Sequence, residues 1–199
     1  MTRLDEKFIA GEVCFDLSRF DSKSFPVREF VDSLTKKLDH ARIMSFEPVL
    51  KYADFPSLDL SSEVGSGQDL QKDHTEVFDV LKWLSERKSV NEIVELSILD
   101  RLHNPHDEIK IGEWVNKLGV QVLNWRCLDL PLSILEEATK ERIRELHLYT
   151  GGKRAVIGHW ISSQGVKTFP NVWGYPPSIL LEVLHLTNSL SSFASSMSM

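Results

Sequence analysis

The feature that most constrains this chain is a change of apolar period that recurs between residues 92 and 149. From Glu92 the apolar side chains alternate in steps of two, which is typical of a strand, and after Pro105 they follow the spacing of an amphipathic helix. Strand-type patterns return at 120–125 and 143–149, with a second helical segment from Pro131 between them. Parallel strands need such crossover connections. The sequence therefore predicts an α/β fold of alternating strands and helices with a mainly parallel sheet.

Two of these elements carry apolar faces that point to a common core. The strand from Glu92 turns Val94, Leu96 and Ile98 to one side. The helix after Pro105 is expected to end at Gly119 in a left-handed conformation. Its apolar face comprises Ile111, Trp114, Val115 and Leu118. We expect Trp114 and Leu118 in the core, where Trp114→Ala would cost about 3–5 kcal/mol.

The other elements follow weaker patterns. Pro26 opens a helical pattern that runs to Leu38, and Asp73 and Glu76 have the spacing of a capping box before an apolar helix face. The run 155–161 is ambiguous between helix and strand. Strand candidates follow at 166–169 and 181–186.

Composition divides the chain into four parts. Residues 57–69 are rich in Ser, Gly and Asp without apolar periodicity, and the last nine residues are rich in Ser. We expect an N-terminal helix-containing segment at 1–56, a linker or loop at 57–73, an α/β domain at 74–190 and a disordered tail at 191–199.

A repeat architecture is the open alternative to an ordinary parallel sheet. The expected strand starts near residues 94, 120, 144 and 166 recur at intervals within the range of leucine-rich repeats. The segment Leu181–Leu186 also has the Leu-x-x-Leu-x-Leu spacing, although the asparagine of that motif is displaced to Asn188. The sequence thus leaves a leucine-rich-repeat-like form of the α/β fold open.

Charge and cysteine content limit the classes of partner and compartment. A net charge of -6 disfavours nucleic acid. The charged N-terminus and the lack of a long apolar run predict neither a signal peptide nor a membrane span. Cys14 and Cys127 are too few and too far apart for a disulfide framework. We therefore expect a soluble cytoplasmic protein without a nucleic-acid or membrane partner.

The densest group of metal-ligand side chains is a poor metal motif. It comprises His103, His106, Asp107 and Glu108. We interpret the last three as the first turn of a helix, where carboxylates complement the dipole. His147 and His185 lie in extended patterns, and Cys127 lacks an activating base. No metal, cofactor or catalytic residue is assigned from these patterns.

The turn that follows Tyr149 also lacks a recognisable binding motif. Its Gly151-Gly152-Lys153-Arg154 segment matches neither phosphate-loop pattern, so we expect a tight turn with two solvated charges. The five tryptophans are expected to serve mainly in the core rather than in a ligand cage. They are Trp83, Trp114, Trp125, Trp160 and Trp173.

Several blocks between Val77 and Trp160 together resemble the region that precedes the protease domain in fungal subtilisin-like proteins. The blocks are Phe78 to Trp83, Val94 to Ile98, Pro105 to Glu108, Val120 to Trp125, Asp129-Leu130, Ile143 to Tyr149, Gly151-Gly152, Ala155-Val156 and Trp160. Asn124 departs from this pattern, where an acidic residue is expected, and so does Gly151-Gly152-Lys153.

The resemblance implies an accessory region and not a protease. Subtilisin-like enzymes need Asp, His and Ser in characteristic motifs, and none of these motifs is present. We therefore expect a non-catalytic regulatory or protein-interaction domain whose partner is a protein, with a subtilisin-like protease domain as the candidate. Two alternatives stay open: a fragment of a subtilisin-like serine endopeptidase whose triad lies outside this chain, and a short leucine-rich-repeat-like recognition module.

Overall fold

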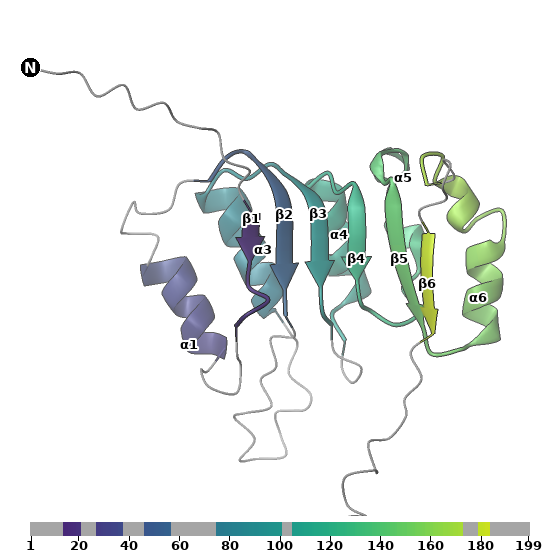
Figure 1. Cartoon of the computed structure of the whole chain (residues 1–199), viewed down its shortest axis with the longest axis horizontal. Coiled ribbons are helices and arrows are strands. Elements are labelled where there is room, and N and C mark those ends of the chain that lie inside the picture. Colours follow the sequence, from purple (N-terminus) through teal and green to yellow (C-terminus); the bar gives the residue numbers. More distant parts are fainter. Residues whose placement is uncertain are drawn as a thin grey trace, which may run out of the picture.

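The computed structural model describes residues 14–20, 27–37, 46–56, 75–100, 105–172 and 179–183. They build one six-stranded sheet in which each strand pairs in parallel with the next strand along the chain. The strands are β1 (Cys14–Asp16), β2 (Val49–Phe55), β3 (Glu92–Ile98), β4 (Val122–Trp125), β5 (Glu145–Thr150) and β6 (Ile179–Val183). Figure 1 looks onto this sheet. The predicted α/β class and parallel sheet are confirmed.

Helices and helical turns connect the strands. They are α1 (Val27–Asp32) with the π-helical turn η1 (Ser33–Lys37), α3 (Glu76–Arg87), α4 (Glu108–Lys117), α5 (Glu137–Arg142) and α6 (Arg154–Ile161), together with the 3-10 turns η4 (Leu132–Ile134) and η5 (Val166–Thr168). Parallel crossovers are almost always right-handed, so a strand order that never reverses places successive helices on one face. Accordingly, α1 contacts α3, α3 contacts α4, and α4 contacts α5. In Figure 1, α3 and α4 lie behind the sheet, and α1 and α6 lie beside its two ends.

Four strand segments bury apolar side chains at one shared spacing, in which a residue is followed by others three and five positions later. All of these side chains are at most 2% exposed. They are Leu50, Ala53 and Phe55; Ile93, Leu96 and Ile98; Val120, Leu123 and Trp125; and Ile143, Leu146 and Leu148. This spacing corrects the strict alternation predicted from Glu92, because Ile93 is buried where Val94 was expected.

The helix predicted after Pro105 is present as α4. Its N-cap residue, Asp107, accepts a hydrogen bond from the backbone N–H of Lys110 at 2.9 Å. Gly119 follows the helix with φ of 61°, and Leu118 is fully buried. The end of this helix at Gly119 and the burial of Leu118 therefore agree with the sequence prediction, whereas the helix begins at Glu108, later than the start predicted after Pro105.

Trp114 is not a core residue, which corrects the prediction made for it. Its side chain is only partly buried and packs at the margin of the core, with Nζ of Lys117 4.6 Å from the ring centroid. Truncating a ring that is already partly in contact with water costs less free energy of unfolding than truncating a buried ring. We expect Trp114→Ala to lower the free energy of unfolding by about 1–2 kcal/mol and Trp125→Ala, at a buried position, by about 3–5 kcal/mol. Urea denaturation of both variants checks this ranking, and equal losses would contradict it.

Other predicted elements differ in type or extent. The segment 166–169 is the 3-10 turn η5 and not a strand; Val166 and Phe169 are three residues apart and therefore share its buried side. The helix predicted from Pro131 divides into η4 and α5, and Ala138 is exposed. The ambiguous run 155–161 is helical.

Two strands of the sheet, β2 and β6, differ from the sequence prediction. No strand was predicted at 49–55, yet β2 is central to pairing with β1 and β3. β6 overlaps the strand predicted at 181–186 only through its last three residues, and 184–186 lie outside the described residues. So do the predicted linker at 57–73 and the tail at 191–199.

The start of α3 also differs from the predicted capping box. The helix begins at Glu76, and its N-cap is Thr75, whose side chain makes no capping hydrogen bond. Asp73 lies outside the described residues.

Among the helices that the structure describes, none has the length and apolarity that a bilayer crossing requires.

Candidate functional site

The sheet face opposite the helices carries a set of mostly polar, solvent-accessible side chains. Two rows cross the strands in continuous register. One row contains Cys14, Tyr52, Glu95, Val122 and Glu145, and the other contains Asp16, Asp54, Ser97 and Asn124. His147 follows on β5. All ten side chains are exposed or partly exposed, and we call them the open face.

The open face is acidic, and its β5 side contains side chains that contact one another. Four of its ten residues are carboxylates, and none is Lys or Arg. At the β5 side, His147 is 15% exposed and its Nε2 lies 2.7 Å from Oε1 of Glu145. Tyr149, at the end of β5, is nearly buried and donates to Oδ1 of Asn124 at 2.7 Å. Glu145 still has 45% of its side chain exposed, and the other three carboxylates lie over β1, β2 and β3, which we call the acidic side.

Tyr52 lies at the centre of this acidic side. It is paired in register with Cys14 and Glu95 and shares its face with Asp54, two residues on. Burial and the hydrogen bond to Asp54, together with the negative charges of Asp54, Asp16 and Glu95, raise the pKa of Tyr52 to about 12. The hydroxyl stays protonated at neutral pH and lies in a negative electrostatic potential.

A second group of polar side chains is buried where β3 and β4 end. The Asp100 carboxylate is completely buried and accepts from the backbone N–H of His106 at 3.2 Å. Nδ1 of His106 lies 2.9 Å from Oδ1 of Asp100, and Nε1 of Trp125 donates to Oδ2 at 3.3 Å. Phe78 packs on both rings. This cluster joins α3, β4 and the approach to α4, which is a structural role.

The same cluster corrects the interpretation of His106 as a first-turn residue. Asp107 and Glu108 do occupy the N-cap and first turn of α4, but His106 precedes the helix and is 7% exposed. Its position is set by its contact with Asp100. His103 and His185 lie outside the described residues. Among the described side chains, no group of His, Cys, Asp and Glu has the arrangement of a metal site.

Cys127 is placed beside this cluster and is protected from reaction. Its side chain is 1% exposed, and Sγ contacts the carbonyl oxygen of Leu128 at 3.8 Å. Burial, followed by the negative charges of Asp100 and Glu108, raises the pKa of the Cys127 thiol. Because the thiolate is the nucleophilic form, this position is unsuited to covalent catalysis.

The turn after β5 is organised by Asp129. Its carboxylate accepts from Oγ1 of Thr150 at 2.8 Å and from the backbone N–H of Gly151 at 3.3 Å, and it contacts Nζ of Lys153 at 2.9 Å. Burial alone would raise the pKa of Asp129, but these hydrogen bonds and the Lys153 charge lower it. Gly152 takes a φ of 86°. The tight turn is as predicted, whereas Lys153 is ion-paired rather than only solvated.

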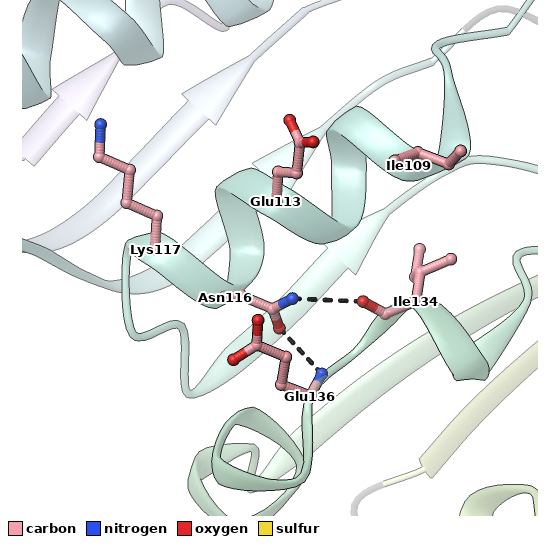
Figure 2. Close-up of a pocket in the computed structure, with 6 residues that line it drawn as sticks. All are labelled: Ile109, Glu113, Asn116, Lys117, Ile134 and Glu136. Carbon is pink, nitrogen blue, oxygen red and sulfur yellow. Dashed lines mark hydrogen bonds between the residues drawn. The ribbon is translucent and has the colours of Figure 1, made fainter.

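Figure 2 shows a shallow pocket of about 550 Å³ in the helical layer. The side chain of Asn116 occupies its floor, donating to the carbonyl oxygen of Ile134 at 3.2 Å and accepting from the backbone N–H of Glu136 at 3.1 Å. Asn116 thereby holds η4 against α4. The amide of Asn116 is therefore committed to the backbone.

Ser133 and His159 do not form a hydrolytic pair. Ser133 lies in η4 and His159 in α6, both are exposed, and no hydrogen bond joins them. The open face is the remaining candidate site, and its chemistry is that of a binding surface. Comparison of the chain with the models of known protein families, with curated proteins and with solved structures finds no match.

Proposed function

We propose that this chain is a non-catalytic protein-recognition domain that binds its partner through the open face. The observation that carries the proposal is the strand order, since successive parallel strands without reversal leave one sheet face uncovered by the described helices. That face presents side chains from five strands at fixed spacing. A rigid row of polar side chains suits the recognition of an extended surface.

The recurring burial pattern supports a repeat-like form of this module. Leucine-rich repeats bury Leu-x-x-Leu-x-Leu positions and use the residues between them on the sheet surface. Ile93, Leu96 and Ile98 have the same spacing and are fully buried, while Glu95 and Ser97 between them are accessible. The open face would then correspond to the ligand-binding surface of such a module.

The resemblance to fungal subtilisin-like proteins supplies a candidate partner. In that proposal, the domain positions or restrains a protease domain and performs no chemistry itself. The burial of Cys127 supports a binding role. A protease fragment with a triad elsewhere has no specific observation in its favour.

The role is tested by selecting peptides from an unbiased displayed library with the purified chain. Ser97 lies in the middle of the open face, between Asp54 and Asn124 in register. We expect Ser97→Trp to weaken the selected peptides at least about tenfold, which corresponds to about 1.4 kcal/mol, because the indole covers neighbouring positions. Fluorescence anisotropy measures the dissociation constants.

The matched control is Ser133→Trp, which adds the same side chain to an exposed serine in η4, in the helical layer. This variant should bind the selected peptides as the unmodified chain does. If Ser133→Trp weakens binding of the selected peptides and Ser97→Trp does not, the peptides bind to the helical layer. That result would overturn the proposed use of the open face.

A further inference from the structure

We infer that the open face receives a basic partner segment, whose Lys or Arg side chains pair with Asp16, Asp54 and Glu95 around Tyr52. This inference rests on the proposed recognition role and adds the chemistry of the partner. The four residues, which we call the acidic tyrosine patch, come from β1, β2 and β3.

The register places the patch within reach of a single extended segment. Asp16 pairs with Asp54, and Tyr52 pairs with Glu95, so the residues occupy adjacent positions on neighbouring strands. Neighbouring strands are about 4.8 Å apart, and alternate residues of one strand are about 7 Å apart. Two basic side chains at alternate positions of an extended peptide can therefore each reach a carboxylate.

Charge complementarity favours a cation over other occupants. Burial and hydrogen bonding, together with the carboxylates at Asp54, Asp16 and Glu95, raise the pKa of Tyr52. The tyrosine ring adds an accessible aromatic surface, since a guanidinium or ammonium group is attracted to an aromatic face. An acidic segment would be repelled by the same carboxylates.

The carboxylates are expected to contribute more to selectivity for charge than to affinity. Exposed ion pairs are individually weak, whereas a patch of like charge increases the association rate and selects the sign of the partner. We therefore expect selectivity between basic and acidic peptides to exceed the loss caused by removing any one carboxylate.

The test uses the full chain and two labelled peptides on a common Ser/Gly background, one with Arg at alternate positions and the other with Glu at the same positions. The Arg peptide should bind at low salt and weaken as salt is added, and the Glu peptide should not bind. D54N together with E95Q should weaken the Arg peptide about tenfold. Fluorescence anisotropy gives the dissociation constants, and circular dichroism verifies that each variant is folded.

The control pair is E113Q with E136Q, which removes the same charge from exposed positions in the helical layer (Figure 2). It should leave the affinity for the Arg peptide within about twofold of the unmodified chain. An equal loss in both pairs would show attraction to net charge alone and would overturn the patch. If D54N with E95Q does not fold, D16N with E95Q replaces it, removes the same charge and should weaken binding by a similar factor.

The outcomes separate this inference from the recognition role. Library peptides that bind the open face without basic residues would leave the recognition role in place and overturn the basic partner. An Arg peptide that binds no better than the Glu peptide would do the same. Concentration-dependent self-association that D54N with E95Q abolishes would make a second copy of the chain the occupant and would also overturn the inference.

Discussion

Asp100→Ala is expected to lower the free energy of unfolding by about 3–5 kcal/mol. The substitution removes the buried acceptor of the His106 backbone N–H and of the Trp125 indole N–H, and it leaves the His106 ring beside an apolar methyl group. Buried donors that lose their acceptor retain their full desolvation cost. Urea denaturation followed by far-ultraviolet circular dichroism measures the loss.

Asp107→Ala provides the scale for this prediction. Asp107 is the exposed N-cap of α4, and its removal should cost about 1 kcal/mol. If Asp100→Ala costs no more than Asp107→Ala, the carboxylate does not hold the cluster together. Asp100→Asn, which keeps an acceptor oxygen, should fall between the two alanine variants.

Gly165→Ala is expected to cost about 3 kcal/mol, because the chain passes too close to the end of α6 for a side chain. A Cβ atom at Gly165 would lie 2.0 Å from the carbonyl oxygen of Trp160 and 2.5 Å from that of His159. Both are backbone atoms, so α6 or η5 must move to relieve the overlap. Thermal and urea denaturation both report the loss.

Gly158→Ala, a substitution within α6 itself, is the matched control. Gly158 is exposed in the middle of α6, and an added Cβ meets no atom within 4 Å. Alanine is the better helix former there, so this variant should gain about 0.5–1 kcal/mol. A similar loss in both variants would mean that α6 tolerates no substitution and that the close approach at Gly165 is not the cause.

The elements that the sequence predicted best are those in which local pattern and tertiary contact agree. In α4, the apolar spacing through Val115 and the left-handed Gly119 both act within a few residues. The strand from Glu92 was found for the same reason. The alternating pattern placed Val94 in the core, but the buried residue is Ile93. The buried positions of this strand are three and then two residues apart, which differs from a simple strand period of two.

β2 shows why a strand can be hidden from pattern analysis. Its sequence, Val-Leu-Lys-Tyr-Ala-Asp-Phe, buries the small Ala53 and places Lys51 between apolar neighbours. The strand is recognised only through its parallel pairing with β1 and β3. Comparing its buried positions with those of the later strands is the signal that would have identified it.

The candidate site could be identified only from the tertiary structure. Asp16, Tyr52 and Glu95 are far apart in the sequence and individually resemble ordinary surface residues of strands. Their shared face follows from the pairing register, in which each strand adds beside the preceding one. The buried Asp100 was also missed, since its partners at His106 and Trp125 become neighbours only after the strand ends meet.

The sequence by itself determined the α/β class, the end of α4 at Gly119 and the burial of Leu96, Ile98 and Leu118, because apolar period and helix-end signals act over a few residues. Only the tertiary structure decided the strand order, the burial of His106 and the assembly of the acidic tyrosine patch. Local patterns specify which side of a strand is apolar. Which strands become neighbours, and hence which polar side chains share the opposite face, depends on how the crossovers pack against the whole sheet.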